Sequence, residues 1–269
     1  MMKKLLLNIR NKVFGINKIE FLLKENETNS RAELQEALTE VALLHKKIDD
    51  LFAENFPAKT HESFDVRFLA RMEAGFSSAR FFNTFLYDKK VFESDLDLLC
   101  EFVGDISETD LVLEFGVFSG RTINALADRL PKHKLWGFDS FEGLPETWRN
   151  DFVKGTFKVD TLPEVRKNVA LVQGWFDVTL PKFLAENSGQ VGLLHVDCDL
   201  YSSTKTVLNL LKSRFKNGSI IIFDEYFNYP GWEQHEYSAF SEFLSETGYK
   251  FEYLGCNVCH QQVAVKLIA

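Results

Sequence analysis

The sequence lacks the features that mark several broad classes of protein. It has only four cysteines in 269 residues, without the dense, regular spacing of a disulfide-stabilised secreted domain. It has no run of about 18 consecutive apolar residues, the length that a membrane-spanning helix requires. It has no surplus of basic residues either, since the net charge is -8 and the isoelectric point about 5.4. We therefore predict a cytoplasmic protein without a transmembrane segment that does not bind nucleic acid.

The first residues also lack the layout of a secretory signal. Residues 1–12 carry lysines near the start, but the apolar run stops at Leu7 and no small-residue cleavage site follows. A basic and apolar segment of this kind suits a helix docked on the protein or, less favourably, a weak contact with a membrane surface.

Residues 1–60 are predicted to form a helical extension. A polar stretch at 26–30 ends in Ser30, a residue type that caps helices. From residue 34 to residue 52, apolar residues recur three and four positions apart for about three heptads. This spacing predicts a short coiled coil or an amphipathic helix packed on the body or on a second copy, and hence a homo-oligomer formed through these helices.

Residues 61–269 are predicted to form one α/β domain. Residues 61–104 read as a helical lead-in, after which five short apolar runs alternate with helical stretches. Two final runs, 249–255 and 261–268, follow each other without a helix between them. This order predicts a doubly wound, mostly parallel, seven-stranded sheet with a C-terminal antiparallel hairpin.

Acidic residues mark the carboxyl ends of these strands. Glu114, Asp139, Asp197 and Asp224 each lie at or near the end of an apolar run. In a doubly wound sheet, ligands bind beyond the carboxyl ends of the strands. The four acids therefore predict a binding site along that edge.

A glycine-rich turn follows the first apolar run. Gly116 and Gly120 allow the backbone to turn sharply and approach a ligand, and a helix with free amides follows them. Glu114 stands where a dinucleotide-binding turn has its first glycine. A carboxylate there would repel a pyrophosphate and attract an ammonium, so we predict a cofactor with an amino-acid moiety.

Two further segments suit the rest of such a cofactor. Asp139, 25 positions after Glu114, is placed to accept hydrogen bonds from ribose hydroxyls. Gln173 and Trp175 could flank an adenine, although Trp175 suits the core equally well.

Four carboxylates are expected to converge where the fourth and fifth runs end. Asp197 and Asp199 follow one run, and Asp224 and Glu225 follow the next. Without a cation such a cluster would repel itself and raise its own pKa values. An all-oxygen site favours Mg²⁺, with Mn²⁺ and Ca²⁺ as alternatives.

These residues resemble a known family. The Glu-x-Gly-x-x-x-Gly turn and the second acid are similar to class I S-adenosylmethionine-dependent methyltransferases, although Arg121 stands where a second Gly is expected. Residues 138–146, 195–204 and the pair at 224 and 225 resemble the macrocin O-methyltransferase group, which methylates sugar hydroxyls on bacterial natural products using magnesium. The resemblance covers roughly residues 105–269 and implies S-adenosyl-L-methionine and Mg²⁺ as cofactors.

The resemblance also assigns roles to residues. It implies that Asp197, Asp224 and Glu225 bind the metal, which leaves Asp199 as the base that takes the acceptor's proton. Asp199 has one structural alternative, as the cap of the helix that follows. The predicted cofactor-binding residues are Glu114, Gly116, Ser119, Gly120, Thr122, Asp139, Ser140, Gln173, Gly174, Trp175 and Asp197.

The predicted function is methylation of a hydroxyl on a sugar or glycosylated metabolite, so the partner is a small-molecule substrate. A catechol or phenol acceptor is the nearest alternative, because vicinal phenols would chelate the same metal. An NAD-dependent sugar dehydrogenase and a non-catalytic cofactor-binding module are the alternatives of other classes. Aromatic residues in the loops at 140–160 and 226–236 are expected to form an acceptor wall, namely Trp148, Tyr226, Tyr229 and Trp232.

Overall fold

A computed structural model describes residues 65–104, 106–149 and 152–268. The chain divides into two compact units, Met1–Asp65 and Val66–Ala269. The predictions for residues 1–60, namely the coiled coil, the membrane-surface contact and the oligomer, fall outside the described residues.

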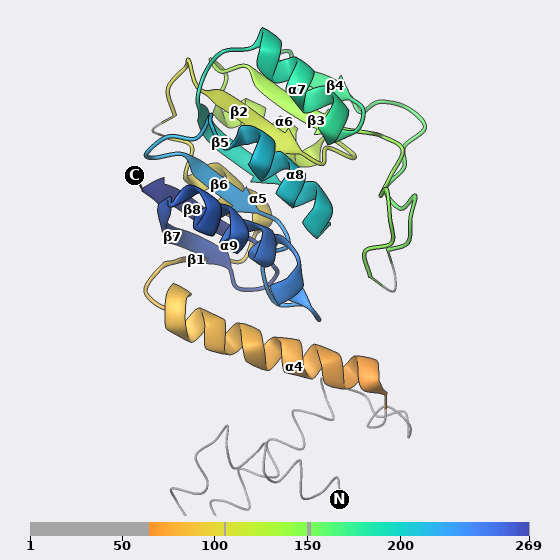
Figure 1. Cartoon of the computed structure of the whole chain (residues 1–269), viewed down its shortest axis with the longest axis vertical. Coiled ribbons are helices and arrows are strands. Elements are labelled where there is room, and N and C mark those ends of the chain that lie inside the picture. Colours follow the sequence, from red (N-terminus) through yellow and green to blue (C-terminus); the bar gives the residue numbers. More distant parts are fainter. Residues whose placement is uncertain (1–64, 105, 150–151, 269) are drawn as a thin grey trace, which may run out of the picture. The chain divides into compact units, whose positions relative to one another are not determined.

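The second unit is built on one eight-stranded sheet (Figure 1), with the strand order β1-β7-β8-β6-β5-β2-β3-β4. The strands β2 to β6 are paired in parallel, whereas β8 is antiparallel to both β6 and β7. The predicted parallel sheet and terminal hairpin are therefore confirmed. The strands are β1 (Lys90–Phe92), β2 (Leu111–Phe115), β3 (Leu135–Asp139), β4 (Val169–Gln173), β5 (Val191–Val196), β6 (Ile220–Phe223), β7 (Lys250–Asn257) and β8 (Val263–Ile268).

The strand β1 corrects the sequence prediction, which gave seven strands and a wholly helical lead-in. It lies within residues 61–104 and pairs in parallel with the last three residues of β7. A three-residue strand at a sheet edge is too short to show an alternating pattern, and pairing with a distant segment supplies its stability.

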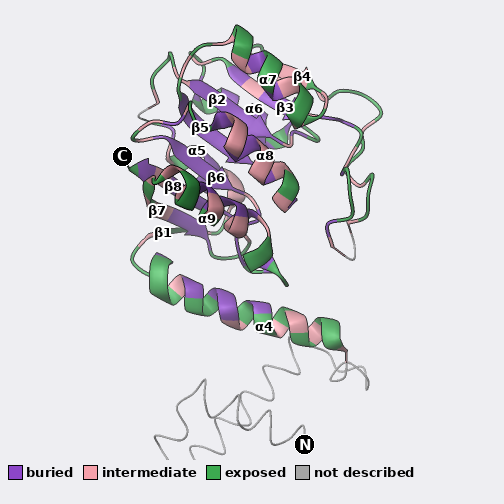
Figure 2. Cartoon of the chain, viewed as in Figure 1, coloured by how far each residue is buried: buried purple, intermediate pink, exposed green. Residues whose placement is uncertain are grey.

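The central strands are buried along their whole length. Every residue of β2, β5 and β6 is buried (Figure 2), which explains why their sequences are continuous apolar runs rather than alternating ones. Glu114 and His195 are the ionisable exceptions within these strands.

Helices cover both faces of the sheet. Leu180, Leu208 and Phe240 are core residues from α7, α8 and α9 on one face, and Leu99 and Ile123 belong to α5 and α6 in the other cluster. Two layers of helix around a buried sheet match the predicted doubly wound fold. The helices are α5 (Asp95–Glu101), α6 (Arg121–Arg129), α7 (Phe176–Glu186), α8 (Tyr201–Leu211) and α9 (Glu236–Thr247).

The helix α4 (Val66–Phe81) begins the described unit and continues into the π-helix η2 (Phe82–Leu86). Its Ser77 Oγ accepts a hydrogen bond from Trp232 Nε1 at 3.0 Å, and its Ser78 Oγ accepts one from the Asn228 amide at 2.9 Å. Phe81 packs its ring edge against Trp232. These contacts attach α4 to the loop that follows β6.

The sequence predicted that membrane-spanning helices and disulfide bonds are absent. Among the described residues, no helix combines the length and apolarity needed to cross a membrane. Cys100, Cys198, Cys256 and Cys259 are all free thiols, as the absence of a disulfide spacing predicted.

Candidate active site

A cavity of about 740 Å³ lies at the carboxyl ends of the parallel strands. It is lined by the turn after β2, the segments after β3, β5 and β6, and the start of α7. This is the edge at which the strand-end acids were expected to meet. The predicted residues that line it are Gly116, Asp139, Ser140, Trp175, Asp197, Asp199, Asp224 and Glu225.

The other predicted cofactor residues lie outside this lining. Ser119 is exposed on the turn, Gly120 precedes the first residue of α6, and Thr122 is buried within α6. Gln173 is exposed at the end of β4, and Gly174 follows it with a positive φ of 134°. Their binding roles stay predictions.

Glu114 does not line the cavity. It is buried in the sheet, where one carboxylate oxygen accepts a hydrogen bond from Thr122 Oγ1 at 3.0 Å. The other oxygen lies 2.9 Å from Nδ1 of His195, its neighbour in register on β5. The Glu114 carboxylate is therefore paired with a buried histidine. The pattern of strand-end acids did not indicate this contact.

The glycine-rich turn packs directly against the end of β5. Gly116 has a φ of 95°, and a Cβ placed there would lie 1.6 Å from the backbone oxygen of Asp197. Asp139 holds the turn from the other side, because its Oδ2 accepts the amides of Val117 and Phe118 at 2.9 and 2.8 Å. The turn is thus fixed before any ligand binds.

Replacing Gly116 by Ala is expected to destabilise the protein by at least about 2 kcal/mol, because backbone strain adds to overpacking. Thermal or urea unfolding measures the loss. Gly218→Ala is the matched control, since Gly218 has a φ of 89° and no atom within 4 Å of its added Cβ. Equal losses of stability in both variants would show that the close approach of Gly116 to Asp197 does not contribute to the effect.

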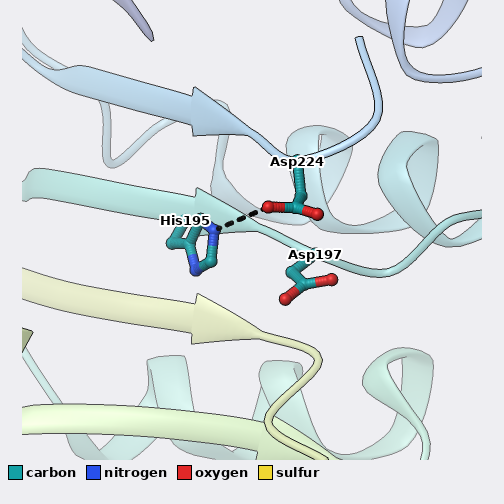
Figure 3. A group of neighbouring side chains, drawn as sticks. All are labelled: His195, Asp197 and Asp224. Carbon is teal, nitrogen blue, oxygen red and sulfur yellow. Dashed lines mark ion pairs between the residues drawn. The ribbon is translucent and has the colours of Figure 1, made fainter. Parts of the chain in front are cut away.

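An acidic cluster with one histidine lies at the ends of β5 and β6. Figure 3 shows the ring of His195 directed at Asp224, with Asp197 beside them. Donor atoms of these three residues all lie within 4.8 Å of one another. Asp224 Oδ1 also accepts a hydrogen bond from Gln262 Nε2 at 3.0 Å, which holds that carboxylate from outside the cluster.

The charges in the cluster are strongly coupled. Burial opposes the charge of His195, but the carboxylates of Asp224 and Glu114 outweigh it and raise the histidine pKa well above its usual value. Burial also opposes the charge of Asp224, yet His195 keeps the pKa of that carboxyl lowered. Burial and the Asp224 charge raise the pKa of Asp197 well above its usual range. The arrangement would gain from an added cation.

Glu225 lies against the same cavity but outside the group of three. Its Oε2 is buried without a hydrogen-bond partner, and burial followed by the Asp224 charge raises its pKa. Its backbone amide donates to Glu236 Oε2 at 3.0 Å. Glu236 is a fully buried acid that sequence reasoning missed, since a glutamate at a helix start is ordinarily a surface residue.

Asp199 lines the cavity and has a left-handed backbone conformation. Its φ is 63°, it is buried, and no hydrogen bond of its side chain is found among the described residues. Burial and the Asp224 charge raise its pKa to about 7. The capping position of α8 is Leu200, without a side-chain hydrogen bond, so Asp199 does not cap this helix.

The expected aromatic wall is only partly present. Trp148 lines the cavity, as does Trp175, which is 37% exposed and so does not belong to the core. Tyr226, Tyr229 and Trp232 are instead buried in the core cluster, because the loop after β6 folds back onto α4 and α9. Next to Trp148 lies Arg149, a cavity residue that sequence reasoning missed because no motif contains it.

Residues 113–226 match a protein family described as a methyltransferase domain. The matched segment runs from β2 to the loop after β6 and so includes the glycine-rich turn and the acidic cluster. This match favours the methyltransferase interpretation over the dehydrogenase alternative.

Two curated relatives come from Streptomyces. The 8-demethyl-8-(2,3-dimethoxy-alpha-L-rhamnosyl)-tetracenomycin-C 4'-O-methyltransferase of Streptomyces olivaceus is 30% identical over 46% of this chain and 53% of its own. The demethyldecarbamoylnovobiocin O-methyltransferase of Streptomyces niveus is 27% identical over 48% of this chain and 56% of its own. The chain thus spans about half the length of the curated relatives it matches.

A solved structure shares the fold over a longer stretch. The crystal structure of CalS11, a calicheamicin methyltransferase, superposes with a TM-score of 0.51 at 27% identity, covering 64% of this chain and 76% of that one.

Proposed function

We propose that this chain, whose residues 113–226 match a methyltransferase domain family, transfers a methyl group from S-adenosyl-L-methionine to a hydroxyl of a sugar or glycosylated metabolite. One observation carries the proposal: a single cavity joins the glycine-rich turn after β2 to the carboxylates after β5 and β6. Two relatives named as O-methyltransferases support the reaction, and the rhamnosyl group in the name of the first supports the choice of acceptor.

The cofactor suits the part of the cavity near β2 and β3. Asp139 uses three of its roughly four acceptor positions on the amides of Val117, Phe118 and Phe141, which leaves capacity for a ribose hydroxyl. Trp175 lies half-exposed at the cavity wall, where its ring is free to stack on an adenine. The cofactor supplies an electrophilic methyl group on sulfur.

A divalent cation suits the acidic cluster. Asp197 and Asp224 offer oxygens close together, and a cation there would offset the burial and the Asp224 charge that raise the pKa of Asp197. The third ligand is either Glu225, whose Oε2 is buried and unpartnered, or the Nε2 of His195. A bound Mg²⁺ would lower the pKa of an acceptor hydroxyl.

Asp199 is the base in this proposal. A sugar hydroxyl is almost wholly protonated at neutral pH, so its oxygen attacks only as its proton leaves. The Asp199 carboxylate lies in the cavity with no competing hydrogen bond among the described residues, so it is available to receive that proton. The rigid turn and the cavity walls keep the acceptor oxygen and the methyl group in line.

The test is an assay with methyl-labelled S-adenosyl-L-methionine and a panel of glycosides and catechols, with products identified by mass spectrometry. We expect one methyl group on a sugar oxygen of at least one glycoside. Exclusive methylation of catechols would show that the acceptor is a phenol and not a sugar. No transfer to any member of a broad panel would argue against the enzyme assignment.

A further inference from the structure

One wall of the cavity carries an arginine held by aromatic rings. The guanidinium carbon of Arg149 lies 3.7 Å from the ring centroid of Trp148, 4.8 Å from that of Phe152 and 5.1 Å from that of Tyr229. Contact with an aromatic face restrains a guanidinium while leaving its N–H donors able to bind an anion. Among the described residues, no carboxylate forms an ion pair with this side chain, so the aromatic rings position it.

The guanidinium makes no hydrogen bond or ion pair with any residue that the structure describes. Its Nε is buried from solvent and unpartnered. A buried donor that lacks a partner is costly, more so when it is charged. Among the described residues, Arg149 is also the single Arg or Lys that lines the cavity.

Trp148 provides a second, independent observation at the same wall. Its side chain is only 8% exposed, and its Nε1 has no hydrogen-bond partner. An indole N–H and a guanidinium can only donate hydrogen bonds. The two neighbouring side chains therefore offer donors and no acceptor, which selects for a ligand group rich in oxygen.

The rest of the cavity has the opposite character. Asp197, Asp199, Asp224 and Glu225 lie at the strand ends, where an anionic group would be repelled unless a cation intervened. An anionic substituent of an acceptor would therefore be held at the Trp148 and Arg149 wall while its hydroxyl faces Asp199. Burial in this cavity strengthens such a contact, because competing water is limited.

We propose that Arg149 and Trp148 form a subsite for an anionic group of the acceptor, a carboxylate or a phosphate, and so determine acceptor specificity. This inference rests on the proposed function of the cavity as an acceptor site. It adds that the preferred acceptor is an acidic sugar derivative or a sugar phosphate, not a neutral glycoside. A planar guanidinium matches both anions through paired N–H donors.

The test is binding, measured by calorimetry on the full chain with saturating cofactor product and Mg²⁺. One pair of probes is p-nitrophenyl β-D-glucuronide and p-nitrophenyl β-D-glucoside, and the other is glucose 1-phosphate and methyl glucoside. We expect at least one anionic probe to bind about tenfold or more tightly than its neutral partner, the effect of charge-assisted hydrogen bonds. The pair that shows the preference identifies the anion.

In Arg149→Met this preference is expected to fall to about twofold or less, and in Trp148→Phe, which keeps a ring but removes the N–H, to an intermediate value. Arg80→Met is the matched control, since Arg80 is exposed on α4 and does not line the cavity. Equal or undetectable binding of the anionic probes by the wild type would overturn the subsite, as would a preference that survives in Arg149→Met. Anion preference without methyl transfer to any acceptor would instead contradict the proposed function alone.

Discussion

Asp199→Asn is expected to lower the turnover of methyl transfer by about 10²- to 10⁴-fold, the usual contribution of a general base. The cause is loss of a cavity carboxylate whose side chain makes no hydrogen bond among the described residues and which is therefore available to take the proton. Affinity for the cofactor product, measured by calorimetry, should change by less than about threefold, because binding does not require proton transfer.

Asparagine is the right replacement at this position. Asp199 has a φ of 63°, and asparagine tolerates the left-handed region far better than alanine does. The variant thus removes the charge with little backbone strain. Asp160→Asn serves as the control, since Asp160 is exposed and lies outside the cavity lining. Undiminished turnover in Asp199→Asn would remove this residue from the reaction.

Removal of divalent cations with a chelator is expected to lower turnover by roughly three orders of magnitude, because a cation that polarises the acceptor oxygen contributes several kcal/mol. Added Mg²⁺ should restore activity and raise the unfolding temperature. The rise should be larger at pH 8 than at pH 6, since cations compete with protons for the carboxylates. Full activity in the chelated protein would exclude a metal role.

Two variants identify the third ligand. If Glu225 binds the cation, Glu225→Gln should weaken Mg²⁺ binding by about 10-fold or more while His195→Asn, through its contact with Asp224, weakens it less. The reverse order would assign the ligand to His195. Glu233→Gln is the control, because Glu233 is exposed in the short helix η3 (Trp232–Gln234).

Much of the fold is predictable because it depends on local patterns. The buried strands appear as apolar runs, and the helices between them dictate parallel pairing. The strand β1 is different, since its three residues are fixed by pairing with Gly255, Cys256 and Asn257, far along the chain. No local signal records such a pairing.

The site, like the fold, is predictable where it depends on local sequence patterns and not where it depends on strand register. The strand-end rule places Asp139, Asp197 and Asp224 correctly at one edge, and all three line the cavity. It does not indicate that Glu114 faces His195, which only the register of β2 and β5 reveals, and the cofactor role of Glu114 stays a prediction. Side chains two apart on a strand share a face, so the spacing of His195 and Asp197 is the signal that could have placed the histidine in the cluster.

The strand β1 also bears on where this domain can be cut. It covers the buried end of β7, whereas the exposed start of β7 carries the charged residues Lys250 and Glu252. A fragment trimmed to the family signature at 113–226 would lose β1 and β7 together, and one begun at residue 105 would keep β7 with its apolar edge open. Open apolar edges template aggregation. A fragment that resists aggregation must therefore begin at residue 90 or before, so that β1 still covers the edge of β7. The residues of the candidate site do not determine this limit.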